Sequence, residues 1–261
     1  MLGAIIGDIV GSRFEFNNTN RLDFELFGKE CRFTDDTICT AAVADAILNH
    51  KSYKDAMLEW CRKYSNPNIG FSGTFLQWVY SKDPQPYGSW GNGSAMRASS
   101  IGWLYDTEQE VLEQAKLSAE ITHDHPEGVK GAQAVALAVF LARKGVSKTL
   151  MLTKLLDFYP IFATPIVGSN AFDTSCQATL PVCLGIIEKA NSFEEAIRYA
   201  VAVGGDSDTI ACIVGAIAEA LWGVPQKIME EAVNFLSRDI LKIIANFTIT
   251  TCLNKLKMKN S

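Results

Sequence analysis

Histidine is scarce in this chain, and its cysteines are not arranged as a disulfide framework or a zinc site. The sequence has three histidines among 261 residues, and its seven cysteines are an odd number without a C-x-x-C pair. The histidines and dispersed cysteines offer no usual ligand spacing for zinc. The odd cysteine count argues against a disulfide framework. We therefore expect reduced, buried thiols and a cytoplasmic protein.

Long apolar runs and blocks of like charge are also missing. The longest apolar run, Ile210 to Ala218, is too short to span a bilayer. The apolar start contains Asp8 and has no basic lead, which disfavours a signal peptide. A formal net charge of −5 disfavours non-specific nucleic-acid binding, and we interpret the basic tail NKLKMKN at 254–260 as a solvated end. Because no Pro-rich or low-complexity spacer marks a linker, we expect one compact domain over residues 1–261, with no membrane segment.

Helical periodicity dominates the rest of the chain, and alternating apolar and polar residues are rare. TEQE at 107–110 and SFEE at 192–195 both predict capping boxes that open helices. A helix is also expected from Pro126 to just before Gly145, and another from near Ser207 to Gly223. Long Gly- and Asn-rich connections are expected at 12–33, 65–75, 83–94 and 163–174. The pattern predicts an all-α domain with a site built from loops.

Two acidic stretches near opposite ends of the chain each precede an expected helix. FTDDT occupies 33–37 and GGDSDT occupies 204–209. One aspartate at a helix start is explained by capping and by the helix dipole. A second aspartate gains less and repels the first, so a cation site is the alternative interpretation. Carboxylate and threonine oxygens suit Mg²⁺, Mn²⁺ or Ca²⁺, and two such clusters brought together would hold two adjacent ions.

Three further stretches are ambiguous by themselves. Glu15 follows a Gly-rich helix, and a lone glutamate there is most often a surface charge. YGSWGNGSAMR at 87–97 combines flexible backbone N–H groups with an aromatic ring at a helix start, which suits a diphosphate, although a plain turn is the simpler interpretation. THDHP at 122–126 offers two histidines, which at a helix junction are more often local caps than metal ligands.

Taken together, these five stretches resemble the ADP-ribosylglycohydrolase family. The matching motifs run from Gly3 to about Gly223 in the expected order, and TDDT paired with GGDSDT is highly specific. The resemblance implies a compact, orthogonal all-α fold that holds two Mg²⁺ ions, with Mn²⁺ often accepted. It also implies cleavage of the glycosidic bond between ADP-ribose and an acceptor.

The resemblance also assigns roles to individual residues. It implies metal ligation by Thr34, Asp35, Asp36, Asp206, Asp208 and Thr209. It implies catalytic roles for Glu15, Asp35 and Asp208. Substrate contacts are implied for Gly88, Ser89, Trp90, Gly91, Asn92, Gly93, His123, Ser169 and Asn170, the last two from a loop whose alignment is ambiguous by a residue or more. We hypothesise that the ions orient the ribose and position a water, while Glu15 handles a proton.

Two other functions are weighed beside this one. An ADP-ribose-binding protein without turnover could share the fold, but all six ligand positions and Glu15 are present here. A metal phosphohydrolase is suggested by HDH at 123–125, but the chain has few histidines for one. The expected partners are an ADP-ribosylated protein or small-molecule conjugate, with ADP-ribose as product. Arginine, serine, a nucleic-acid base and a metabolite are all compatible acceptors, and a monomer is expected.

Overall fold

The computed structural model of the protein describes residues 1–259, so the basic tail lies partly outside the described residues. The first helices are α1 (Leu2–Gly11), α2 (Asp35–Leu48), α3 (Tyr53–Lys63), the 3-10 turn η1 (Pro67–Ile69), α4 (Gly73–Val79), α5 (Gly93–Met96) and α6 (Ser99–Leu104). They are followed by α7 (Glu108–Glu120), α8 (Pro126–Arg143), α9 (Lys148–Leu155), α10 (Cys176–Lys189), α11 (Phe193–Val203), α12 (Ser207–Trp222), α13 (Gln226–Ala232), η2 (Val233–Phe235) and α14 (Arg238–Lys259). Residues 1–259 form no strand beyond an isolated bridge between Gly91 and Ser175, which confirms the all-α prediction.

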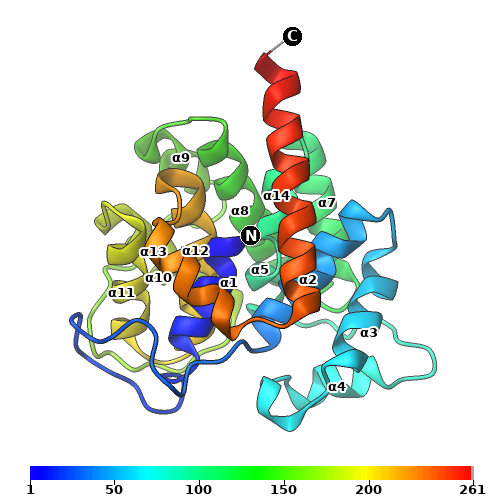
Figure 1. The fold of residues 1–261 in the computed structure, drawn as a ribbon, viewed down its shortest axis with the longest axis horizontal. Helices are drawn as coiled ribbons and strands as arrows, with labels where there is room; N and C mark the ends of the chain where they lie inside the picture. The colour runs from blue at the N-terminus through cyan, green and yellow to red at the C-terminus, as the bar shows by residue number, and fades with distance from the viewer. Residues whose placement is uncertain (260–261) are drawn as a thin grey trace.

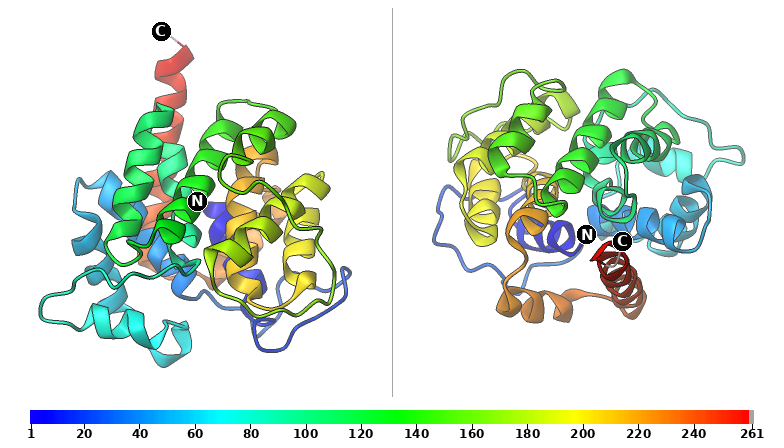
Figure 2. Two further views of the ribbon diagram at one scale, coloured as in Figure 1. Left: turned by 180° about the vertical axis from the view of Figure 1, so that it is seen from behind. Right: turned by 90° about the horizontal axis from the view of Figure 1, so that it is seen from above.

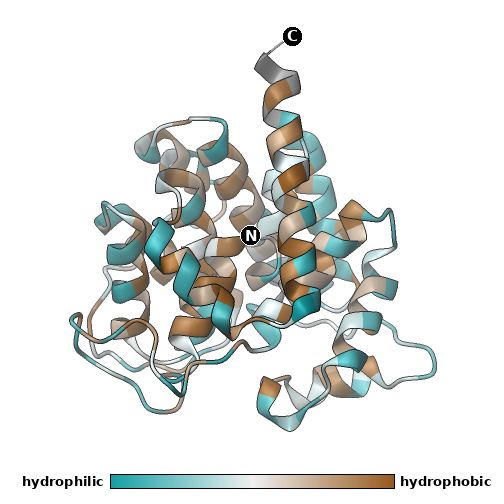
Figure 3. Cartoon of the chain, in the orientation of Figure 1, coloured by the Kyte–Doolittle hydropathy of each residue, from teal (hydrophilic) through white to brown (hydrophobic). Residues whose placement is uncertain are grey.

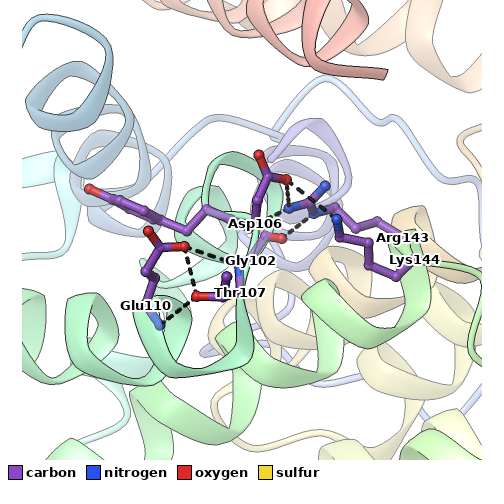
Figure 4. A network of polar contacts seen from close by, with 7 residues as sticks. Gly102, Asp106, Thr107, Glu110, Arg143 and Lys144 are labelled. Atoms are coloured by element: carbon purple, nitrogen blue, oxygen red, sulfur yellow. Dashed lines mark hydrogen bonds and ion pairs between the residues drawn. The ribbon is translucent and has the colours of Figure 1, made fainter. Parts of the chain in front are cut away.

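Local signals set where several of these helices begin. Thr107 and Glu110 form the predicted capping box of α7, each side chain bonding the other residue's backbone N–H (Figure 4). At α11 the box is only half formed: Ser192 accepts from the N–H of Glu195, but the Glu195 carboxylate accepts from Asn191 instead of Ser192. In both cases the first turn gains a partner for an N–H that the helix itself leaves free.

The end of α8 is fixed to the turn before α7. Gly145 follows α8 with a φ of +82°, which favours glycine. Arg143 donates to the carbonyl of Gly102 at 2.6 Å and to Asp106 at 3.2 Å (Figure 4). The guanidinium therefore holds α6, the α6–α7 turn and α8 in one arrangement.

The close pairing of α1 with α12 sets the geometry of the site. A Cβ on Gly7 would overlap the carbonyl of Ala211, and a Cβ on Gly11 would overlap the backbone at Ser207 and Asp208. Only glycine permits this approach, because any side chain would push the two helices apart. The contact brings Asp8 of α1 beside the start of α12, although the two segments are about 200 residues apart in the sequence.

The remaining helices enclose this pair, and the long connections lie together. The connection before α2 lies at the end of the molecule away from the C-terminus, and the connection before α10 descends from α9 to reach the same end, whereas α14 extends past the other helices at the opposite end (Figures 1 and 2). Polar residues lie along the connections and outer helix faces (Figure 3). None of the helices within residues 1–259 is both long and apolar enough to cross a membrane.

Candidate metal centre

The starts of α2 and α12 meet, so the two acidic motifs form one cluster. Thr209 donates its hydroxyl to Asp36 Oδ2 at 3.2 Å, which joins the two motifs directly. Asp8, Asp36 and Asp208 each place a carboxylate oxygen within 4.8 Å of the others. Glu15, Asp206 and Asp208 form a second group of the same kind. Asp208 belongs to both groups, so the two candidate cation positions are adjacent.

Ordinary capping does not account for these aspartates. The N-cap of α2 is Thr34, whose hydroxyl accepts from the N–H of Asp36 at 3.3 Å. Asp206 occupies the N-cap position of α12 but its side chain makes no capping hydrogen bond there. Its carboxylate accepts instead from the Asn92 amide at 2.6 Å. The aspartates therefore lie close to one another in one cluster, an arrangement that helix capping alone does not require.

Asp8 is a member of the cluster that the sequence motifs did not single out. Its carboxylate accepts from the N–H and hydroxyl of Thr34, at 2.9 and 2.7 Å, and from the N–H of Thr37 at 3.1 Å. It also accepts a short hydrogen bond from the Thr37 hydroxyl. These bonds fix the first turn of α2 relative to α1. A polar residue within the apolar run of α1 was the only signal for it in the sequence.

Burial and mutual repulsion disfavour ionisation throughout the cluster. Burial, followed by the charge of Asp8, raises the pKa of Asp35 to about 8. The pKa values of Asp36 and Asp208 lie well above their usual range for the same two reasons, burial first and neighbouring carboxylates second. Burial and then the charge of Asp206 raise the pKa of Glu15 to about 7. A cation among these oxygens would reverse this tendency by favouring the charged forms.

The donor set fits hard divalent cations. Asp36 Oδ1 is buried and has no hydrogen-bond partner in the structure. A buried carboxylate oxygen left in this state is costly unless an ion or another group binds it. The side chains at the six predicted ligand positions offer carboxylate and hydroxyl oxygens, the ligand types preferred by Mg²⁺ and Mn²⁺. No histidine or cysteine belongs to either acidic group found among the described residues.

Gly70 sets the space beside Asp35. Its φ is +105°, and a Cβ at this position would lie 2.9 Å from Asp35 Oδ1. A side chain at position 70 would therefore be strained and would press on the carboxylate. The loop before α4 thus approaches the cluster closely because it carries glycine there.

The cluster opens into a cavity of about 700 Å³. The Gly-rich loop lines it with the residues Gly88, Ser89, Trp90, Gly91, Asn92 and Gly93. Asn92 connects this loop to the cluster through Asp206, and the Gly88 N–H donates to Asp124 at 2.7 Å. The cavity is therefore lined both by carboxylates of the cluster and by the Gly-rich loop.

The two histidines of THDHP lie in different environments. His125 caps α8 by accepting from the N–H of Glu127 at 3.1 Å, as the junction predicted. His123 is 5% exposed and lines the cavity beside the Gly-rich loop. Since neither joins the acidic groups, nothing in this geometry favours the phosphohydrolase alternative.

Ser169 and Asn170 lie outside the lining of the cavity. Ser169 donates its hydroxyl to the Val203 carbonyl at 3.2 Å, and the Asn170 N–H donates to the same carbonyl at 3.0 Å. Their connection lines the cavity with a segment slightly further along the chain, 172–175. In the sequence, the alignment of this loop with the family was ambiguous by a residue or more, and residues 172–175 lie within the ambiguous stretch.

Comparisons with known proteins identify the family and the fold of this chain. Residues 1–255 match the family model described as ADP-ribosylglycohydrolase. The chain is 25% identical to ADP-ribosylhydrolase ARH3 of Mus musculus, over 92% of this chain and 88% of that protein. It is 26% identical to the ADP-ribosylarginine hydrolase Tri1 of Pseudomonas putida, over 86% of this chain and 70% of that protein. A solved ADP-ribosylglycohydrolase-related protein complex has a chain with the same fold, with a TM-score of 0.69 at 22% identity and 96% coverage of both chains.

Proposed function

The chain belongs to the ADP-ribosylglycohydrolase family, and we propose that it is a Mg²⁺-dependent hydrolase that releases ADP-ribose from an acceptor. The observation that carries this proposal is the convergence of both acidic motifs, Glu15 and the Gly-rich loop on one cavity. The substrate would be an ADP-ribosylated protein side chain or another ADP-ribosyl conjugate. The relatives that the chain resembles carry names of both general and arginine-specific hydrolases, so the acceptor is left to experiment.

The proposed metal ligands are the six oxygen donors at the two helix starts. They are Thr34, Asp35, Asp36, Asp206, Asp208 and Thr209. The unpartnered Oδ1 of Asp36 and the shared position of Asp208 support two adjacent sites. When bound, Mg²⁺ or Mn²⁺ would orient the ribose hydroxyls and lower the pKa of a water. Asp8 would hold Thr34 and the first turn of α2 in place for this purpose.

Glu15 is the proposed proton-transfer group. Glycoside hydrolysis usually requires a group that gives or takes a proton near neutral pH. Glu15 lines the cavity, is only partly buried and has a pKa of about 7, raised by burial and by Asp206. The proposed reaction forms a bond between a water oxygen and the ribose anomeric carbon and breaks the bond from that carbon to the acceptor. Glu15 takes the proton of the water and gives it to the departing acceptor, which regenerates the carboxylate.

The Gly-rich loop is the proposed diphosphate and ribose subsite. Its residues line the cavity, and Gly88 has a φ of +66° that favours glycine. Asn92 is held by Asp206, which couples the loop to the proposed metal ligands. We keep Ser169 and Asn170 as proposed substrate contacts on the ribose or adenine side, and add the lining segment 172–175 from the same connection.

A panel of ADP-ribosyl conjugates tests this function. Arginine-, serine- and nucleic-acid-linked ADP-ribose are incubated with the protein in Mg²⁺ and in EDTA, and free ADP-ribose is quantified. Release from at least one linkage in Mg²⁺, abolished by EDTA, is the expected result and identifies the acceptor class. Mg²⁺-dependent ADP-ribose binding without release from any linkage would instead favour a binding protein.

We also propose a cytoplasmic monomer. All seven cysteines are free thiols, and six of them are buried, as expected for a reducing compartment. Light scattering coupled to size-exclusion chromatography tests the oligomeric state directly.

A further inference from the structure

Arg97 is a buried cation for which no carboxylate partner is recorded among the described residues. It follows the Gly-rich loop at the end of α5 and is 1% exposed. Its Nη2 donates to the Ser118 carbonyl at 2.8 Å and to Thr122 Oγ1 at 3.0 Å, while its Nε has no partner. Burying a guanidinium in this way is costly, so its position calls for a role beyond packing.

Thr122 links this cation to His123. Thr122 is fully buried, and its Oγ1 lies 2.7 Å from His123 Nδ1. In its bond to Thr122, Arg97 is the donor and the hydroxyl oxygen is the acceptor. The single proton of the Thr122 hydroxyl therefore remains available for a second hydrogen bond. Among the described residues, His123 Nδ1 is the one acceptor within reach of the Thr122 hydroxyl proton. If Nδ1 carried a proton, the buried Thr122 hydroxyl would be left without an acceptor.

The charge state of His123 is consistent with this arrangement. Burial, followed by the nearby charge of Arg97, places the pKa of His123 well below its usual range. A neutral imidazole carries one proton, so an accepting Nδ1 requires that Nε2 be protonated.

The Nε2 edge of His123 faces the Gly-rich loop. A Cβ on Gly93 would lie 3.2 Å from Nε2, and one on Gly91 would lie 3.5 Å from it. All three residues line the cavity, and no hydrogen-bond acceptor for Nε2 is recorded among the described residues. The absence of side chains at 91 and 93 leaves this N–H open to a ligand in the loop.

We propose that Arg97 and Thr122 are positioning residues that hold His123 in its Nε2–H tautomer, so that it donates a hydrogen bond to a phosphate oxygen of ADP-ribose. The identity of the ligand rests on the proposed function, whereas the tautomer does not. A purely structural role for Arg97, capping the last carbonyls of α7, would leave the tautomer of His123 unspecified.

Histidine-selective ¹⁵N labelling tests the tautomer in the intact protein without ligand. Long-range ¹H–¹⁵N correlation spectra at pH 7 distinguish protonated from unprotonated ring nitrogens, and only three histidines need assignment. A His123→Asn spectrum identifies the relevant pattern. The expected result is protonated Nε2 and unprotonated Nδ1. A protonated Nδ1, alone or together with Nε2, would overturn the proposal even if the enzyme is active.

Thr122→Val and Thr122→Ser test the relay. Valine preserves the shape but removes the hydroxyl, so we expect mixed tautomers at His123 and about tenfold weaker ADP-ribose binding, the effect of one misdirected hydrogen bond. Serine keeps the hydroxyl, so Thr122→Ser should show the wild-type tautomer of His123 and wild-type ADP-ribose binding. An unchanged tautomer in Thr122→Val would overturn the role of Thr122. If wild-type protein binds no ADP-ribose, the proposed function and the phosphate contact both fail, while the spectrum still decides the tautomer. If Thr122→Val does not fold, the wild-type spectrum and Thr122→Ser carry the decision.

Discussion

Asn92 Nδ2 lies 2.6 Å from Asp206 Oδ2, so the loop proposed to hold the diphosphate is bonded to a proposed metal ligand. The same amide also donates to Thr179 Oγ1 at 3.1 Å. With both of its protons used, Asn92 has one orientation, and the Asp206 carboxylate is fixed with it. The Gly-rich loop and the acidic cluster therefore form one unit.

Asn92→Ala should weaken metal binding as well as substrate binding. Loss of a hydrogen bond to a charged group costs about 1.5–3 kcal/mol, so we expect activity to fall about 10- to 100-fold, with a higher Mg²⁺ concentration needed for half-maximal rate. Mg²⁺ titration of the rate measures this. Asn234→Ala is the matched control, because Asn234 is an exposed residue of the turn η2 whose amide donates to carbonyls of α13. An unchanged Mg²⁺ requirement in Asn92→Ala would separate the loop from the metal centre.

Gly70, which follows the 3-10 turn η1, and Gly73, the first residue of α4, provide a matched test of the space around Asp35. Gly70→Ala would be strained at a φ of +105° and would press on Asp35, so we expect a loss of about 1–3 kcal/mol in stability and a reduced rate. Gly73→Ala meets no atom within 4 Å and should be neutral or slightly stabilising. Denaturant unfolding and the rate are measured for both variants. Equal effects at the two positions would contradict the role assigned to Gly70.

The stability of the metal-free protein should fall as pH rises. The folded pKa values of Glu15 and Asp35, about 7 and about 8, lie above their ordinary values of 4.5 and 3.8. A carboxyl whose pKa is higher in the folded state binds its proton more tightly there than in the unfolded state. The resulting contribution to the free energy of unfolding is complete near pH 4 and is lost progressively as the pH rises to about 8. In EDTA the free energy of unfolding should therefore decrease across this window.

Saturating Mg²⁺ should remove that decrease, because a bound cation favours the ionised carboxylates. Urea unfolding at several pH values, with Mg²⁺ and with EDTA, makes the comparison. Identical pH profiles in the two conditions would mean that the cluster does not bind the cation.

Glu15→Gln should remove proton transfer while leaving binding intact. We expect kcat to fall about 10²- to 10⁴-fold, the usual contribution of a general acid or base. In Mg²⁺ the cations should offset the repulsion from Asp206 that helps raise the pKa of Glu15, so this pKa should be lower than in the metal-free protein. The wild-type rate should therefore decline on acidification below about pH 7, where Glu15 becomes protonated. The variant should lack this decline. A pH–rate profile of each, with ADP-ribose binding measured in parallel, checks it.

Much of this site could be predicted because its motifs are local. The pairs Asp35–Asp36 and Asp206–Asp208 are visible as unusual charges at helix starts, and the capping box at Thr107 follows from a four-residue pattern. Asp8 was less visible, because its partners, Thr34 and Thr37, lie across a long connection. Its role depends on the close approach of α1 to α12, which periodicity in one segment does not reveal.

Tertiary contacts also decided details that local patterns left open. Glu195 fits a capping box with Ser192, but its carboxylate turns to the N–H of Asn191. The connection containing Ser169 reaches the cavity through residues 172–175, a shift that depends on how this loop folds over α11 and α12. The Arg97–Thr122–His123 chain joins two motifs that the sequence presents separately.

We propose that the aspartates of α2 and α12 hold the cation on which ADP-ribose release depends. The most direct test compares Asp208→Asn with Asp55→Asn, because Asp55 is an exposed aspartate in the first turn of α3 and acts only on the helix end. ADP-ribose release from the cleaved linkage is measured across a Mg²⁺ titration. The account predicts at least about 100-fold slower release and a weakened Mg²⁺ response in Asp208→Asn, with Asp55→Asn unchanged. Wild-type rate and Mg²⁺ response in Asp208→Asn would contradict it.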